Sequence, residues 1–365
     1  VLTDGRGRPV RPSIIWCDSR ATAMQPAIIE KTGRERLLQH LHNLPGNFTF
    51  SKLAWVQAHE ARTLKQAYKC MLPGDYIAMK LTGKYTTTPA GLSEGIMYDY
   101  TQNQPATWLF EAMDIPTGLL PEMLPVFGDS LRLSPDGAAE AGLKAGIPVS
   151  YRAGDQPNNA FSLGLLSAGE VAATAGTSGV VYAVSDQLVP DSLSRTNSFA
   201  HVNHQPSDAR HGILLCINGC GIANAWIKKM AQATDYQTMN QLASTVAAGS
   251  DGLVFLPFGN GSERMLGGQQ PGGSFHHLDF SRHHQPQLYR AVQEGIACAF
   301  RYGIDIMAEN GLKLQHMRAG QANLFQSPVF AQSLANLSQV SIQLFNTDGS
   351  LGAARGAALG AGLYT

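Results

Sequence analysis

A chain of 365 residues is too long for one ordinary domain, and its 44% hydrophobic residues can supply a core to each of two domains. Lysine and arginine together number 27, as do aspartate and glutamate, so the formal net charge is zero. This balance, without a basic stripe, argues against a nucleic-acid partner and favours a small polar ligand.

Membrane and secretory signals are also missing from the sequence. No apolar run reaches the roughly 18 to 20 residues that a bilayer-spanning helix needs, and no secretory leader is recognisable. The chain opens on Val1, so its native start is expected to lie upstream. The odd number of widely spaced cysteines argues against a disulfide framework and favours a reduced, cytoplasmic protein; they are Cys17, Cys70, Cys216, Cys220 and Cys298.

The first 150 residues alternate helical and irregular stretches. Residues 13–17 form a short apolar run that ends in a polar turn, a pattern typical of a buried strand. Residues 52–62 and 75–81 carry the apolar spacing of helices, and Gly83 is placed to cap the second. The sequence therefore predicts a mixed segment with few strands.

Near residue 150 the pattern changes, which places a domain boundary at 148–152 and divides the chain into domains 1–150 and 151–365. Strands and helices then alternate, as in an α/β layer architecture. Extended segments are predicted at 146–151, 171–184, 253–257 and 315–318, and helices at 222–230, 288–311 and 327–337.

Histidines gather in pairs at His276-His277 and His283-His284, in a stretch rich in glycine, proline and serine. A zinc site needs three or four ligands with a supporting shell, and no carboxylate or cysteine stands at such a spacing. These histidines are therefore predicted to be solvated loop residues, and no metal ligand is assigned in this chain.

Four small-residue turns are candidates for chemistry. Gly-Thr-Ser-Gly at 176–179 lies between apolar runs and is either a plain hairpin turn or a nest of backbone N–H groups that binds phosphate. Asp155 follows an extended segment and is either a helix N-cap or a carboxylate that accepts a proton from an alcohol. The turns at 219–221 and 318–323 are ordinary connections unless they line a ligand site at the end of a strand.

Read in chain order, these turns resemble the FGGY carbohydrate kinases, and among them most closely the xylulokinases. The resemblance covers essentially the whole chain. Matching segments occur in order at 12–20, 52–60, 72–77 with 81–83, 153–155, 175–179, 256–264 and 352–358. Each is commonplace alone, whereas seven in the family's order are specific.

The resemblance implies an actin-like ATPase fold, in which two α/β domains of the RNase-H-like type close over a sugar and MgATP. It places Asp155 at the catalytic base, Trp16 and Asp18 in the region that lines the sugar, and Gln156 beside the base. On the nucleotide side, the resemblance implies a second phosphate loop formed by Gly176, Thr177 and Ser178. It implies two further nucleotide contacts, one near Gly221 and one near Gly320 and Asn323.

Three departures from the family pattern stand beside the resemblance. Ala319-Gly320-Gln321 occurs where the family usually has three glycines, which bears on the adenosine contacts. The family's Asp-containing first phosphate loop has no counterpart near the start, and the terminal helices have none after Thr365. The chain is therefore expected to be trimmed at both ends; a genuine lack of that loop would severely impair catalysis.

The implied reaction is transfer of the γ-phosphoryl group of ATP, with Mg²⁺, to a ketose, giving D-xylulose 5-phosphate from D-xylulose. Xylulokinases often have an asparagine at the position of Gln156. This difference leaves phosphorylation of ribulose, gluconate or glycerol as alternative functions. A non-catalytic sugar- or nucleotide-binding protein on the same fold is the alternative from another class. The oligomeric state is left open, with a homodimer as one option.

Overall fold

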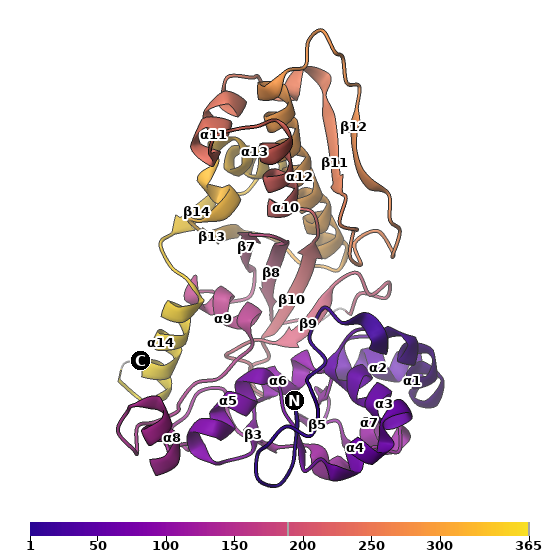
Figure 1. Cartoon of the computed structure of the whole chain (residues 1–365), viewed down its shortest axis with the longest axis vertical. Helices are drawn as coiled ribbons and strands as arrows, with labels where there is room; N and C mark the ends of the chain where they lie inside the picture. The colour runs from indigo at the N-terminus through magenta and orange to yellow at the C-terminus, as the bar shows by residue number, and fades with distance from the viewer. Residues whose placement is uncertain (188–189, 364–365) are drawn as a thin grey trace.

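A computed structural model describes residues 1–187 and 190–363 of the chain. The molecule is elongated, with the N-terminal helices at one end, helices α10–α13 at the other, and a sheet between them (Figure 1). Helix α14 (Gly349–Gly360) returns from the far end and lies beside α9 (Asp155–Ser162). Within the described residues, no helix is long and apolar enough to cross a membrane.

The N-terminal part consists of short helices and two-stranded pairings. The strand pairs are β1 (Leu2–Thr3) with β2 (Lys69–Cys70), β3 (Thr86–Thr87) with β6 (Glu122–Met123), and β4 (Tyr98–Asp99) with β5 (Gln104–Pro105). The 3-10 helices are η1 (Ser19–Met24) and η2 (Thr117–Leu119). The α-helices are α1 (Gln25–Thr32), α2 (Arg34–Leu41), α3 (Thr49–His59), α4 (Ala61–Gln66), α5 (Pro73–Thr82), α6 (Pro89–Glu94), α7 (Thr107–Ala112) and α8 (Pro135–Ala141).

The second half is built around a six-stranded sheet in the order β14-β13-β7-β8-β10-β9. Its strands are β7 (Glu170–Ala175), β8 (Gly179–Ser185), β9 (Asn197–Ala200), β10 (His211–Ile217), β13 (His316–Gly320) and β14 (Ile342–Phe345). Strand β7 runs antiparallel to β8 and parallel to β13, so it joins the two parts of the sheet. The remaining elements are α10 (Gly221–Met230), α11 (Tyr236–Ser244), η3 (Ser250–Gly252), β11 (Val254–Phe258), β12 (Gly272–His276), α12 (Gln285–Glu309), η4 (Asn323–Gln326) and α13 (Pro328–Ser338).

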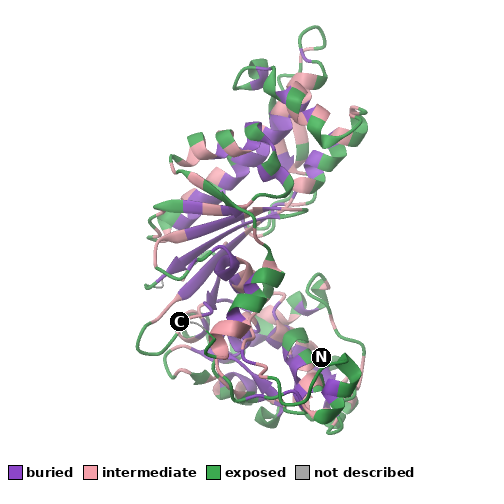
Figure 2. Cartoon of the chain, turned by 90° about the vertical axis from the view of Figure 1, so that its left-hand side faces the viewer, coloured by how far each residue is buried: buried purple, intermediate pink, exposed green. Residues whose placement is uncertain are grey.

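Both faces of the sheet are buried at its central strands β7, β8 and β10, since side chains that point alternately to the two sides are nearly all buried there. On β8, Val181 and Ala183 face the core formed with α10–α13, whereas Val180, Tyr182 and Val184 face a second core. That second core is shared with α2, α3, α6 and α7 of the N-terminal part. Figure 2 shows the buried residues running through the strands. The sheet thus fixes both halves of the chain to each other.

The predictions for the second half are largely confirmed, whereas the strands predicted at 13–17 and 146–151 are wrong. The segment 171–184 is the β7–β8 hairpin, and the predicted long helix is α12. Residues 13–17, however, are irregular, and Ile15 and Trp16 are 57% and 82% exposed. Their carbonyl groups accept hydrogen bonds from side chains, Lys52 to Ile15 at 2.8 Å and Asn47 to Trp16 at 2.7 Å, rather than from a partner strand.

Other expectations need smaller corrections. Residues 146–151 form only isolated bridges, such as Phe127 with Tyr151, and no strand. The helix predicted over 52–62 is interrupted at Glu60, where α3 ends and α4 begins. Gly83 caps α5 in the left-handed conformation, as predicted. His283 is not a solvated loop residue: it is buried and accepts a hydrogen bond from the Asp279 amide at 3.0 Å.

Histidines in and beside the second core are held neutral. His201 and His211 are buried, and the half-buried His42 stacks on Tyr100 with 4.0 Å between ring centroids. Burial lowers the pKa of His42 to about 3 and the pKa values of His201 and His211 to about 4. In the unfolded chain the pKa of each histidine would be about 6.5. At pH values between the folded and the unfolded pKa, the unfolded state therefore binds more protons than the folded state.

The free energy of unfolding is therefore expected to fall as the pH drops from about 6.5 towards about 4, because protonation favours the unfolded state there. His211→Phe should reduce this slope by up to about 1.4 kcal/mol per pH unit. Urea unfolding at a series of pH values measures the slope, with the exposed His316→Phe as control. Equal slopes in His211→Phe and the wild type would contradict the assignment.

Candidate active site

A cleft of about 1780 Å³ lies between the N-terminal part and the sheet. It is lined by the irregular segment before η1, the first two turns of α3, the end of α6, the start of α9, the turn between β7 and β8, and the loop after β13. Of the residues predicted from the sequence, seven line this cleft: Trp16, Asp155, Gln156, Gly176, Ser178, Gly320 and Asn323. Asp18, Thr177 and Gly221 are not among the lining residues.

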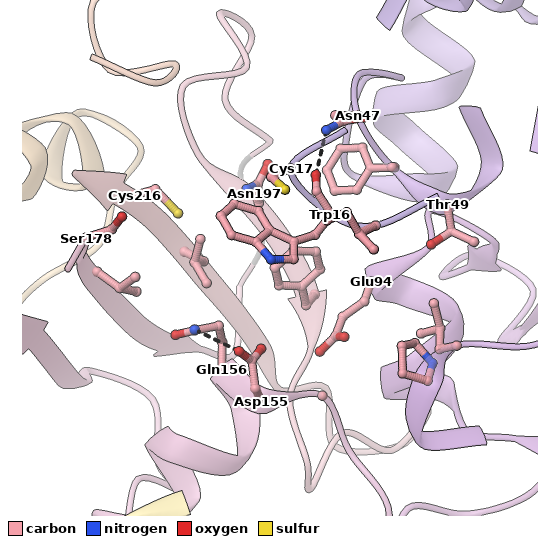
Figure 3. Close-up of a pocket in the computed structure, with 18 of the residues that line it drawn as sticks. Trp16, Cys17, Asn47, Thr49, Glu94, Asp155, Gln156, Ser178, Asn197 and Cys216 are labelled. Atoms are coloured by element: carbon pink, nitrogen blue, oxygen red, sulfur yellow. Dashed lines mark hydrogen bonds between the residues drawn. The ribbon is translucent and has the colours of Figure 1, made fainter. Parts of the chain in front are cut away.

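Asp155 is the first residue of α9, and its carboxylate projects into the cleft (Figure 3). The N-cap of this helix is Gly154, so the interpretation of Asp155 as an N-cap is wrong. The Asp155 carboxylate is exposed and accepts a hydrogen bond from the Gln156 side-chain amide at 3.4 Å. Helix α9 is held in place by α14, since Asn158 donates to the Gly349 carbonyl at 2.8 Å. A proton acceptor on a fixed backbone thus faces the cleft.

The Trp16 ring extends into the cleft that Asp155, Gln156 and Asn197 also line (Figure 3). Its large exposed surface could pack against the C–H groups of a sugar. Asp18 points elsewhere: it accepts from the Arg20 amide as N-cap of η1 and forms an ion pair with the Arg20 guanidinium at 2.7 Å. Hydrogen bonds from Arg20 lower the pKa of Asp18. Of the two predicted sugar-side residues, the structure therefore brings only Trp16 into the cleft.

The turn between β7 and β8 is anchored from one side by the start of α10. The Gly221 amide donates to the Gly176 carbonyl at 2.8 Å, and the Ile222 amide donates to the Thr177 carbonyl at 3.2 Å. In a trans peptide the N–H points opposite to the preceding carbonyl, so the N–H groups of Thr177 and Ser178 point away from α10. They are available as donors to an anion.

Gly221 is required by this close approach. A Cβ atom at Gly221 would lie 2.4 Å from the Gly176 carbonyl oxygen, a distance that real side chains do not reach. Gly221 therefore does not line the cleft but holds the turn that does. The sequence marks the glycine without revealing which backbone it approaches.

The loop after β13 lies beside the same turn. Asn323 has a left-handed backbone conformation (φ 53°). Its side-chain nitrogen Nδ2 would lie 3.7 Å from a Cβ atom built on Gly176. A Cβ atom on Gly320 would be in ordinary contact, 3.6 Å from the Thr347 carbonyl, so glycine is not sterically required there. The structure thus brings the two predicted nucleotide-side loops together.

Sequence reasoning missed Glu94, the last residue of α6, which lines the cleft close to Asp155 (Figure 3). Burial, and to a smaller extent Asp155 and Asp75, raise the pKa of Glu94 to about 8. A glutamate that ends a short helix before Gly95 resembles a surface residue in sequence, so no pattern marks it. Arg264 was also left without a role; it is largely buried, and it donates to the Asn197 side chain at 2.7 Å.

Among the residues that the structure describes, no three histidine, cysteine or carboxylate side chains are grouped so as to hold a metal ion. Asp155, Glu263 and Asp348 are the exposed carboxylates among the described residues that line the cleft.

Two family models match the chain: the N-terminal domain of the FGGY family of carbohydrate kinases over residues 1–162, and its C-terminal domain over residues 171–363. The xylulose kinase of Escherichia coli K12 is 27% identical over 359 residues, which cover 98% of this chain and 72% of that protein.

Solved structures agree with these matches. The xylulose kinase of Rhodospirillum rubrum superposes with a TM-score of 0.88 at 27% identity, over 99% of this chain and 73% of that one. The gluconate kinase of Lactobacillus acidophilus gives a TM-score of 0.84 over 97% of this chain and 71% of that one, and at 20% identity it shows the shared fold alone. The predicted two-domain α/β fold of sugar kinases is confirmed, and the chain belongs to the FGGY family of carbohydrate kinases.

Proposed function

We propose that this carbohydrate kinase transfers the γ-phosphoryl group of MgATP to D-xylulose, giving D-xylulose 5-phosphate and ADP, with Asp155 as the general base. The observation that carries the proposal is the position of the Asp155 carboxylate, exposed in the same cleft that Trp16 and the turn at 176–178 line. The similarity to xylulose kinases supports the choice of sugar.

In the proposed reaction, the 5-hydroxyl oxygen of the sugar forms a bond to the γ-phosphorus while the bond to the β-phosphate oxygen breaks. The hydroxyl proton passes to Asp155, which releases it to water after ADP and product leave. Phosphoryl transfer depends mainly on positioning and charge stabilisation, so the base is expected to contribute on the order of 10² to 10⁴ in rate. Gln156 would orient the carboxylate or a neighbouring hydroxyl group.

On the nucleotide side, the turn formed by Gly176, Thr177 and Ser178 would donate N–H groups to the phosphates as negative charge shifts towards ADP. Gly221 would act indirectly by fixing this turn, and Gly320 with Asn323 would contact the adenosine. Mg²⁺ would enter bound to the ATP phosphates, as part of the substrate. Asp18, which is paired with Arg20, remains a predicted sugar-side residue that would act through the Trp16 segment.

The remaining predictions also belong to the proposal. The domain division at 148–152 stays a prediction; the family matches end at 162 and resume at 171. A cytoplasmic location is supported by five cysteines that are all free. Gln156 keeps ribulose, gluconate and glycerol as alternative acceptors, and ADP release with a panel of these compounds would rank them against D-xylulose.

Asp155→Asn is expected to lower kcat by at least about 100-fold, since an amide cannot accept the proton. The melting temperature and the calorimetric Kd for ATP should remain near the wild-type values. Asp136→Asn, which changes another exposed aspartate in the first turn of a helix, is the matched control and should keep full turnover. Near-normal turnover in Asp155→Asn would remove it from the role of base. Sugar and ATP binding without turnover in the wild type would favour the non-catalytic alternative.

Gly221→Ala is expected to raise KM for ATP by about tenfold or more, because the added methyl group displaces the Gly176 carbonyl and thereby the phosphate-binding turn. KM for the sugar should change much less. Gly118→Ala, where a Cβ atom meets nothing within 4 Å, is the control. Steady-state kinetics with each substrate varied in turn gives both constants, and an unchanged KM for ATP would refute the indirect role of Gly221.

A further inference from the structure

Glu94 is held against the backbone that carries Asp155. A Cβ atom built on Gly154 would lie 1.6 Å from one Glu94 carboxylate oxygen and 2.2 Å from the other. The Glu94 carboxyl group therefore occupies the space that a side chain at residue 154 would need. This contact places the carboxyl group beside the residue that precedes Asp155, and in Figure 3 the two carboxyl groups extend into the same part of the cleft.

Oxygen Oε1 of Glu94 is buried and has no hydrogen-bond partner among the residues that the structure describes. A buried polar atom without a partner costs about 1–3 kcal/mol, so an unpaired carboxyl oxygen at the wall of a ligand cleft is informative. Trp16 lines the same cleft as Glu94 and Asp155 (Figure 3). Glu94 thus lines the cleft with a carboxyl group whose Oε1 is unpaired among the described residues.

The ionisable groups around Glu94 come from five segments of the chain. They are Asp155 on α9, Asp75 on α5, Tyr151 and its neighbour Arg152 before α9, Tyr182 on β8, and Tyr100 after β4. Arg152 is paired with Asp75 at 3.3 Å. Asp155 and Asp75 oppose a negative charge on Glu94, and no described cation is paired with it.

We propose that the Glu94 carboxyl group binds the sugar by donating a hydrogen bond to one of its hydroxyl groups, in the same part of the cleft as the Asp155 carboxylate. The inference rests on the proposed function and adds a sugar-binding residue to it. An ionised Asp155 can only accept hydrogen bonds, whereas a protonated Glu94 can donate one. An acceptor and a donor that lie close together orient a polyol hydroxyl more tightly than two acceptors would.

The protonation of Glu94 gives the proposal a pH signature. With a pKa raised to about 8, Glu94 is neutral at lower pH and ionises as the pH rises through that value. Ionisation removes the donor and leaves two carboxylates close together, which disfavours a bound sugar. KM for the sugar is therefore expected to rise above about pH 8, while KM for ATP, whose proposed site lies at the turn 176–178, should not follow it.

Two substitutions separate the hydrogen bond from packing. Glu94→Gln keeps a donor of the same size at every pH, so KM for D-xylulose should stay within about threefold of the wild type near pH 7 and should lose its rise above about pH 8. Glu94→Met keeps the volume without a donor, so KM for D-xylulose should increase about tenfold near pH 7 with a smaller change in kcat. Glu140→Gln, on the exposed face of α8, is the control.

The measurement is KM and kcat for D-xylulose from about pH 6.5 to about pH 9.5, together with the calorimetric Kd for D-xylulose of the same proteins. A wild-type kinase with a flat KM profile, a Glu94→Met variant with wild-type KM, or a Glu94→Gln variant that keeps the alkaline rise would each overturn the role of Glu94 and leave the proposed reaction intact. A wild-type chain that neither binds nor phosphorylates D-xylulose would refute the proposed function and this inference with it.

Discussion

The burial of both faces of the sheet at its central strands, β7, β8 and β10, is the constraint on which the rest of the structure depends. Each strand of the β7–β8 hairpin contributes alternate residues to two different cores, Val181 to one and Tyr182 to the other. A shift of one residue would exchange these sets, so the register is firmly specified. The turn at 176–178 and the N-terminal helices packed on the second core are consequently fixed relative to each other.

Close backbone contacts then convert this fixed frame into a site. Gly221 allows α10 to hold the carbonyl groups of the phosphate-binding turn, and Gly154 leaves room for the Glu94 carboxyl group beside Asp155. In both cases the missing Cβ atom matters more than backbone flexibility, since neither glycine has a positive φ. The site is therefore assembled by backbone surfaces that approach one another, and the polar side chains extend from those surfaces into the cleft.

The proposed division of labour follows from which groups can donate and which can accept. Backbone N–H groups at 177–178 suit the negative charge of the phosphates, and the exposed Asp155 carboxylate suits a proton leaving a hydroxyl group. Glu94 differs from Asp155 because burial, with further contributions from Asp155 and Asp75, makes its charged form unfavourable. Two carboxyl groups a short distance apart can in this way serve opposite roles in hydrogen bonding.

The sequence by itself determined the family, the hairpin with its small-residue turn, the long helix α12 and the candidate base, because these depend on local periodicity and on motifs in a fixed order. It did not reveal that residues 13–17 lack a partner strand, that Asp18 pairs with Arg20, or that His283 is buried. Glu94 carried no sequence signal, since its raised pKa and its contact with Gly154 arise only when α6 is packed against the start of α9. Partners distant in the sequence decide strand pairing, burial and protonation, and only the tertiary structure supplies them.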